Sequence, residues 1–444
     1  MQLVAYGAQD VYLTGNPKVT FFQAVYKRHT NFAMEMIEQT VNGTAGDSGR
    51  ISVTVARNGD LIGNMYLEVT PSASAKTVGN YAVGSNVWIA EAAVQDVELT
   101  IGGQRIDKHY QRWWRLYAEL YLNDAKKGEW GKVTGGDSLN QTATGAVRLP
   151  LIFFFNRNPG LYLPLIALQY HEVRLDFDLS ADYSKYFATN GVKVWGNYVY
   201  LDTEERRRFA QKGHEYLIEQ VQHTGADGVA AGSNNTRLSY NHPVKEIVWC
   251  YNTDKTSGAS AQLNQRWAFV NDTTKMMASC DIITAAGADA LTNNVMVAPH
   301  QSGCPFLVVG SNGAAGAALG GAQLVEEADV TSAQVQCGPL ETFKLILNGQ
   351  DRFKEQPGTY FNQYQPLQYH SGNPMAGIYS YSFGLKPEEH QPTGTCNFSR
   401  IDNAQVSSAI KTTGAAAITK MSMFAVNYNV LRVQSGMGGL AFSN

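Results

Sequence analysis

The stretch VELTIGGQRIDK, residues 97–108, has a partner further along the chain, FKLILNGQDRFK, residues 343–354. In the first copy Val97, Leu99 and Ile101 alternate with polar residues, and the second copy has Phe343, Leu345 and Leu347 at the same alternate positions. Period-two alternation predicts a β-strand with one buried face. The two copies also share a leucine, a Gly-Gln pair and a final lysine. They indicate one strand-turn unit that occurs twice.

Two more matches keep the same order. NYVYL (197–201) resembles NYNVL (427–431), and RNPGLYLPL (157–165) shares Asn-Pro with GNPMAGIYS (372–380). The Asn-Pro segments lie between the other two matches in both halves. This common order predicts two copies of one all-β domain, joined after the TEERRRF segment near Gly213.

Composition supports many short strands arranged as a sandwich or a barrel. Glycine (42) and tyrosine (23) outnumber proline (14), which favours strands and turns over long helices. Asn58-Gly59 and Asn348-Gly349 each predict a two-residue hairpin. Long loops are expected in the Gly/Ala-rich stretches 284–294 and 310–323.

Few helices are expected. Residues 108–122 carry one aromatic face and predict a helix over a sheet edge; the face comprises Tyr110, Trp113, Trp114, Tyr117, Leu120 and Tyr121. A second helix is predicted from Thr203, as the N-cap, through the three arginines of TEERRRFAQ.

The bulk chemistry excludes several classes of function. A net charge of −3 leaves no net basic surface to neutralise phosphates, which argues against nucleic acid as the main ligand, so no direct nucleic-acid binding is expected. The apolar runs are too short to cross a bilayer, and the N-terminus has no signal-peptide pattern. Five cysteines without CxxC spacing predict reduced thiols. Scattered histidines and missing catalytic motifs predict no enzyme, no metal and no cofactor.

One stretch could still carry chemistry. GLKPEEHQPTGTCNFSRIDNA (384–404) gathers His390, Cys396 and Asp402 close in sequence. A nucleophilic site would require these groups to converge within hydrogen-bond reach, which a sequence does not show. Prolines flank the histidine, so the structural interpretation, a strand end and turn, is favoured.

Several longer stretches resemble a known family. AYGAQDVYLTGNPKVTFFQAVYKRHTNFAME (5–35), LDTEERRRFAQKGHEYLIEQVQ (201–222), NHPVKEI (241–247) and residues 384–404 are similar to the major capsid proteins of the nucleocytoplasmic large DNA viruses. FNRNPGLYLPLIALQYHEVRL (155–175), LNGQDRF (347–353) and NYNVLRVQSGMGGLAFSN (427–444) extend the similarity along the whole chain.

The resemblance implies an all-β double jelly roll: two tandem eight-stranded antiparallel jelly rolls with a few short helices and long loops. The expected division is an N-terminal base segment at 1–30, a first jelly roll at 31–212 and a second at 213–444. Three chains would form a homotrimer, a pseudo-hexagonal capsomer that tiles an icosahedral shell.

The resemblance also implies partners and a location. The expected partners are neighbouring capsomers, minor capsid and penton proteins, and proteins of an internal viral membrane. The protein would be made and assembled in the host cytoplasm and reside in the virion. The base segment would carry the assembly residues Pro17, Phe21, Phe22, Tyr26, Lys27 and Arg28, with Pro17 near a helical start and the aromatic residues on one apolar face.

Five Asn-x-Ser/Thr sequons are present, at Asn42, Asn140, Asn234, Asn271 and Asn397. Nothing in the sequence directs the chain into the secretory pathway, so unmodified chance matches are favoured. Glycans made by viral enzymes remain the alternative.

Two other functions stay open on the sequence alone. A carbohydrate-binding β-sandwich, such as a lectin or a glycan-processing enzyme, would use exposed aromatic residues, and tyrosine is abundant. A viral attachment or spike protein could also be built from jelly rolls. A stable trimer would favour the capsomer, and a monomer that binds a glycan column would favour the lectin.

Overall fold

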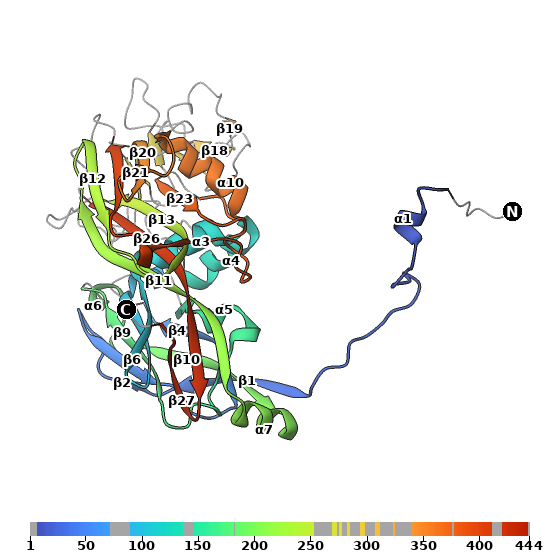
Figure 1. Ribbon diagram of the computed structural model, residues 1–444. Helices are drawn as coiled ribbons and strands as arrows, with labels where there is room; N and C mark the ends of the chain where they lie inside the picture. The colour runs from blue at the N-terminus through green and yellow to red at the C-terminus, as the bar shows by residue number, and fades with distance from the viewer. Residues whose placement is uncertain are drawn as a thin grey trace.

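The computed structural model describes residues 7–71, 89–135, 145–181, 183–252, 339–374, 377–410 and 420–442, together with short strands between 269 and 324. Two sandwiches stack end to end, with helices α3 (Gln111–Tyr121) and α4 (Asp124–Thr134) at the level where they meet (Figure 1). Every strand pair among the described residues is antiparallel.

The first sandwich has two sheets. One has the order β1-β10-β4-β7, with β8 also on β4, and the other has the order β2-β3-β9-β5-β6. Their bounds are β1 Phe32–Gln39, β2 Val41–Asn42, β3 Arg50–Thr54, β4 Leu61–Val69, β5 Val94–Ile101, β6 Gln104–Tyr110, β7 Val147–Pro150, β8 Leu163–Pro164, β9 Val173–Leu179 and β10 Lys193–Leu201.

The second sandwich repeats this arrangement. Its sheets have the orders β11-β26-β13-β23 and β12-β25-β20-β21, with β24, β27 and β22 on their margins. The bounds are β11 His214–Gly228, β12 Gly232–Leu238, β13 Pro243–Asn252, β20 Leu340–Leu347, β21 Gln350–Asp351, β22 Gln356–Pro357, β23 Ile378–Ser382, β24 Cys396–Asn397, β25 Ala404–Ile410, β26 Lys420–Gln434 and β27 Met437–Leu440. Short strands β14 Phe269–Asp272, β15 Lys275–Met277, β16 Ile282–Thr284, β17 Asn294–Val297, β18 Leu307–Gly310 and β19 Gln323–Leu324 form two small sheets.

The internal match of the sequence falls on equivalent strands. Residues 97–108 lie in the β5–β6 hairpin and residues 343–354 span the β20–β21 hairpin, each next to the strand β9 or β25. Both turns, Gly102-Gly103 and Asn348-Gly349, have positive φ at both central residues, as a type I′ turn requires. The prediction of a duplicated all-β domain is confirmed.

The predicted hairpin at Asn58-Gly59 is wrong. Strands β3 and β4 on its two sides belong to opposite sheets, so the connection crosses the sandwich. Neither residue has positive φ, and Gly59 lies against Tyr198, where an added Cβ would be 3.0 Å from the tyrosine Cβ. Close packing against Tyr198, rather than the backbone conformation of a turn, therefore explains why residue 59 is a glycine.

Helices are few and short. Helix α7 (Thr203–Gln211) separates the two sandwiches in sequence, and its N-cap is Asp202 rather than the predicted Thr203. The others are α1 Val11–Thr14, α5 Phe154–Arg157, α6 Tyr183–Tyr186 and α10 Gln365–Tyr369, with single turns η1 Ile89–Ala92, η2 Pro159–Leu161, η3 Tyr360–Tyr364 and η4 Phe398–Arg400. No helix among the described residues combines the length and apolarity needed to cross a membrane.

Two hydrophobic clusters form the interior. One lies within the second sandwich around Trp249, Phe343 and Phe361. The other fills the first sandwich and continues into the second, where it takes in residues of β11, β13, β23 and β26: Ile218, Val248, Cys250, Ile378, Phe424, Val426, Leu431 and Val433. This cluster is therefore an apolar core that both sandwiches share, while the cluster around Trp249 stays within the second sandwich.

The N-terminal segment leaves the body at β1 and extends away from it (Figure 1). Phe21, Phe22 and Tyr26 are 95%, 100% and 88% exposed. The expectation that Pro17 begins a helix is wrong, because α1 ends at Thr14 and residues 17–31 contain no helix. The apolar residues therefore lie along an extended arm, defined here as residues 7–31.

The predicted Gly/Ala-rich loops fall mostly outside the described residues. The structure describes only the strands at their ends: β16, β17, β18 and β19. The prediction that these stretches form projecting loops therefore stays a prediction.

Candidate functional site

The boundary between the two sandwiches contains several buried polar groups, and its framework is helix α3. Trp113 of α3 contacts Phe424 of β26, with ring centroids 5.8 Å apart, and Tyr110 meets His223 of β11 at 4.9 Å. The predicted helix is therefore more buried than a helix at a sheet edge, because the second sandwich packs against it. Seven of its residues are buried, and these include Arg115 and Glu119.

The carboxyl end of α3 is capped by the second sandwich. Gly372 N donates to Leu120 O at 2.9 Å, and Ser371 Oγ donates to Tyr121 O at 3.1 Å. Lys127 Nζ of α4 donates to Asn373 O at 2.7 Å. The last carbonyls of a helix have no partner within the helix, so this contact satisfies them from another domain. We call residues 370–374 and 384–390 the latch.

Gly372 is necessary for this contact. A Cβ built there would lie 2.3 Å from Glu119 O and 2.5 Å from Leu120 O, both of which are backbone atoms. We expect Gly372→Ala to lower stability by about 1–3 kcal/mol, as overpacking does. Gly228→Ala is the control, because an added Cβ there meets nothing within 4 Å. Equal denaturation midpoints for the two variants would contradict the inference that Gly372 is necessary for the contact with α3.

Beneath the latch lies an ion cluster inside the first sandwich. Arg115 is 3.5 Å from Glu91 and 3.3 Å from Glu119, and Lys127 is 2.7 Å from Glu119. The Arg115 and Glu119 side chains are 1% and 0% exposed. Burial raises the pKa of Glu91, and the charge on Arg115 opposes that rise. Buried charges are stable only when paired, so this cluster fixes α3, α4 and the turn η1 to one another.

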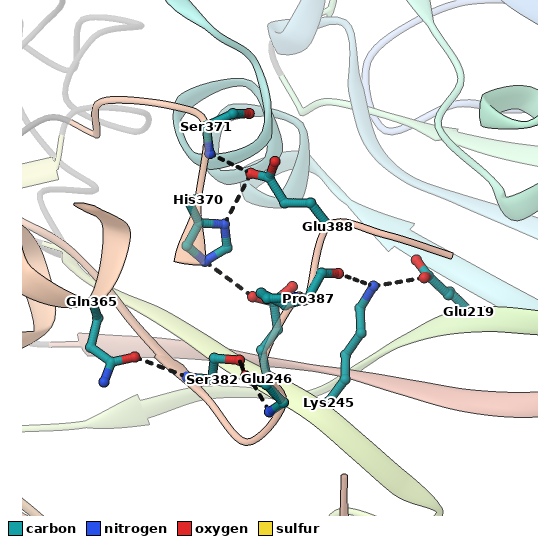
Figure 2. Close-up of polar contacts among 10 residues, drawn as sticks. Glu219, Lys245, Glu246, Gln365, His370, Ser371, Ser382, Pro387 and Glu388 are labelled. Atoms are coloured by element: carbon teal, nitrogen blue, oxygen red, sulfur yellow. Dashed lines mark hydrogen bonds and ion pairs between the residues drawn. The ribbon is translucent and has the colours of Figure 1, made fainter. Parts of the chain in front are cut away.

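A second cluster crosses the boundary. Glu219 of β11 is 2.7 Å from Lys245 of β13 and 2.8 Å from Arg157 of the first sandwich. Lys245 Nζ also donates to Pro387 O of the latch (Figure 2). Burial alone would raise the pKa of Glu219, but the charges of Arg157 and Lys245 outweigh it and hold that pKa below its usual value.

The latch itself is held by His370. Its Nε2 is 3.2 Å from Glu246 Oε2 and its Nδ1 is 3.4 Å from Glu388 Oε1 (Figure 2). Ser371 N donates to the same Glu388 oxygen at 2.7 Å. Burial disfavours the charged imidazole, but Glu246 and Glu388 outweigh it and raise the pKa of His370 to about 9. Burial raises the pKa of Glu246, and the charge on His370 opposes that rise. The close contact on each ring nitrogen supports the ion-paired form.

The stretch 384–404 makes structural contacts. Within the latch, Glu388 accepts a hydrogen bond from Ser371 N and Lys386 pairs with Glu389 at 2.8 Å, while Cys396 lies in β24 beside β13. His390, Cys396 and Asp402 share no hydrogen bond or ion pair. In the part of the chain that the structure describes, no group of three His, Cys, Asp or Glu residues could hold a metal ion. The prediction of no metal remains a prediction for the whole chain.

The remaining predicted residues lie apart from this boundary. The arm carries Phe21, Phe22, Tyr26, Lys27 and Arg28 in exposed positions. Pro17 is exposed too. All six residues lie on the arm, and among the described residues they do not come together with another part of the chain to form a site.

Three sequons have described side chains. Asn42 is exposed in β2, whereas Asn397 accepts a hydrogen bond from Ser399 N. The Asn234 side chain accepts from Ala230 N and donates to Ala230 O and Gly232 O. Asn140 lies outside the described residues, and only the backbone of Asn271 is described. Glycosylation at any of the five stays a prediction.

Sequence reasoning missed the boundary residues. Arg115 and Glu119 resemble an ordinary surface pair at i, i+4 spacing. His370 and Glu246 are far apart in sequence, and no local pattern links them. The NHPVKEI stretch, which carries Lys245 and Glu246, stands out in the sequence only for its resemblance to the capsid family.

Comparisons with known proteins agree with this architecture. Residues 20–202 match the family described as "Major capsid protein N-terminus", and residues 205–439 match "Large eukaryotic DNA virus major capsid protein". The major capsid protein of Paramecium bursaria Chlorella virus 1 is 41% identical, over 100% of this chain and 99% of the relative. That of Phaeocystis pouchetii virus is 40% identical over the same shares.

Solved structures show the same fold. The PBCV-1 virus capsid structure matches with a TM-score of 0.73 and 37% identity, over 96% of this chain and 100% of that one. The Faustovirus major capsid protein has a TM-score of 0.67 at 12% identity, over 97% of this chain and 94% of that one, which shows the fold alone. Both are viral capsid proteins, and the predicted double jelly roll is confirmed.

The fold and these relatives define a structural shell protein. The chain belongs to the family of major capsid proteins of large eukaryotic DNA viruses. It is a structural protein of the viral capsid and not an enzyme. The lectin and spike alternatives are thereby set aside.

Proposed function

We propose that three copies of this chain form a homotrimeric, pseudo-hexagonal capsomer that tiles an icosahedral shell. The observation that supports it is the shared strand order of the two sandwiches, β1-β10-β4-β7 and β11-β26-β13-β23. Three chains with two similar units each supply six similar units around one axis, and closed cyclic symmetry is the rule for such assemblies. The shared core keeps the two units of one chain in a fixed relation.

The oligomeric state is the first test. Light scattering on the purified full chain should give three times 48.6 kDa, and negative-stain images should show particles with six lobes. Elemental analysis of the same sample should find no stoichiometric zinc or iron. A monomer at micromolar concentration would overturn the capsomer, and bound metal would overturn the expectation of no cofactor.

The arm is proposed as the assembly segment at the base of the capsomer. Its apolar side chains have no partner within the described chain, and it continues into β1, where Phe32, Met34 and Met36 are about half exposed on one face of an edge strand. An exposed apolar segment of this kind is typical of a protein contact. Its expected partners are neighbouring capsomers, minor capsid or penton proteins, and proteins of an internal viral membrane.

The division of the chain is proposed as 1–30, 31–212 and 213–444. It is supported by the sheets, since those of the first sandwich end with β10 at Leu201 and those of the second begin with β11 at His214. Direct binding of nucleic acid is not proposed, because the chain has a net charge of −3. Synthesis and assembly in the host cytoplasm remain part of the proposal.

A further inference from the structure

The latch joins a titratable side chain to the contact between the two jelly rolls. His370 lies between two carboxylates, and its side chain is 1% exposed. The next residue, Ser371, donates from its backbone to Glu388 and from its hydroxyl to Tyr121 O of the first jelly roll. Gly372 then caps Leu120 O. The two residues that directly follow His370 therefore make the interdomain hydrogen bonds.

With all three carboxylates of the site ionised, the charges around the latch balance only when His370 is protonated. The carboxylates of Glu219, Glu246 and Glu388 face three cations. These cations are Arg157, Lys245 and His370. Glu246 is 0% exposed, and His370 is the partner that its ion pair uses. A neutral imidazole would leave a net negative charge in a buried site, which is costly.

Among the described residues, no other charged group around His370 offsets this loss. From α3, the neighbouring side chain is Tyr121, whose ring meets the imidazole edge to face at 5.3 Å. Lys245 of β13 is engaged by Glu219 and by Pro387 O. Lys127 of α4 reaches Asn373 O and Glu119. Tyr428 of β26 lies beside Lys245, at 5.6 Å from its Nζ, and carries no charge while protonated.

We propose that the proton on His370 locks residues 370–374 and 384–390 against α3, and that its loss at alkaline pH opens the latch. The opening is local. The apolar core that both jelly rolls share does not titrate, so the jelly rolls stay attached while the capping hydrogen bonds at Leu120 and Tyr121 are released.

The direction of the effect follows from proton linkage. A histidine whose pKa is raised in the closed state binds its proton more tightly there than in the open state. Closure is therefore fully supported below the ordinary value of 6.5 and is lost as the pH rises through about 9. Between these values the opening equilibrium should increase by roughly tenfold per pH unit.

Hydrogen exchange on the full chain tests this directly. Protection of the amides of Ser371 and Gly372, corrected for the intrinsic pH dependence of exchange, should fall by more than about tenfold between pH 7 and pH 9. Amides in β13 and β26, such as Trp249, should keep their protection over the same range. Constant protection at Ser371 and Gly372 would overturn the proposal.

Three variants distinguish the effect of the His370 proton from structural damage caused by a substitution. His370→Gln should show low latch protection at pH 7 and no further loss on raising the pH. Glu388→Gln removes one carboxylate, so the fall in protection should begin at lower pH. His390→Gln is the matched control in the same loop and should behave like the native chain. A His390→Gln response equal to that of His370→Gln would contradict the assignment.

If His370→Gln does not fold, the native chain still decides the question. The His370 ring can be followed by NMR with ring-labelled histidine. A titration midpoint well above 6.5 that coincides with the loss of latch protection supports the lock. A midpoint at or below 6.5 overturns it.

Discussion

Removal of residues 2–31 should abolish particle formation and leave the melting temperature of the trimer unchanged. The arm makes no hydrogen bond or ion pair with the rest of the described chain, and its aromatic residues are almost fully exposed. The truncated chain would resume at Phe32 with β1 intact, so neither apolar core loses a residue. Contacts that need the arm would be lost. Differential scanning calorimetry and particle yield, measured on the same truncated protein, follow both effects.

A shorter deletion identifies the part of the arm that matters. Removal of residues 2–14 takes away α1 and keeps Phe21, Phe22, Tyr26 and the basic pair Lys27-Arg28. It should retain most of the particle yield. A Phe21→Ser, Phe22→Ser double variant should behave like the full deletion. A large drop in melting temperature after the full deletion would show that the aromatic residues belong to the core, where their loss would cost about 3–5 kcal/mol each.

Glu219→Ala should destabilise the folded chain by about 3–5 kcal/mol, because it leaves buried cations without their counter-charge. Glu219 holds Lys245 at 2.7 Å and Arg157 at 2.8 Å, and the Lys245 side chain is 2% exposed. The loss should appear as a lower guanidinium midpoint. Adding Lys245→Met to Glu219→Ala should recover part of the stability, since the more deeply buried of the two unpaired cations is then gone while Arg157, 27% exposed, keeps some contact with water.

The same strand provides the control. Glu215 of β11 pairs with Arg432 of β26 at 2.9 Å, but both side chains are more than half exposed, at 63% and 54%. Exposed pairs contribute little, so Glu215→Ala should change stability by less than about 1 kcal/mol. If the two glutamates gave equal losses, burial would not be what makes Glu219 important.

The sequence predicts the fold well because the fold depends on local patterns. The alternation in residues 97–101 and 343–347 predicts strands, and the Asn348-Gly349 turn is set by its own residues. Asn58-Gly59 shows the limit of this reasoning. Its glycine is required by contact with Tyr198, which lies on a strand far along the chain, so the dipeptide alone cannot indicate its role.

The boundary between the jelly rolls is the part of the structure that local sequence patterns do not predict. Arg115 and Glu119 stand on the polar face of an amphipathic helix, and such a face is usually solvated. Here both are buried beside Glu91 of η1 and Lys127 of α4, which lie on other elements of the chain, so local spacing does not indicate the cluster. The prediction of a helix in the arm is wrong for the opposite reason. The apolar spacing of the arm fits a helix, but its apolar side chains pack on no surface of the same chain, and a short helix is not stable without such packing.

The apolar core that both jelly rolls share affects the order in which the chain can fold during synthesis. Phe424, Val426, Leu431 and Val433 of β26 belong to the same cluster as the interior of the first jelly roll, and Gly372 caps a helix of that jelly roll. Domains usually fold as they leave the ribosome, N-terminal first. Here the first jelly roll stays incompletely packed until residue 433 has been translated and released. Prematurely terminated chains would therefore expose apolar surface at the open core, which makes them substrates for chaperones and proteases rather than subunits of a growing shell.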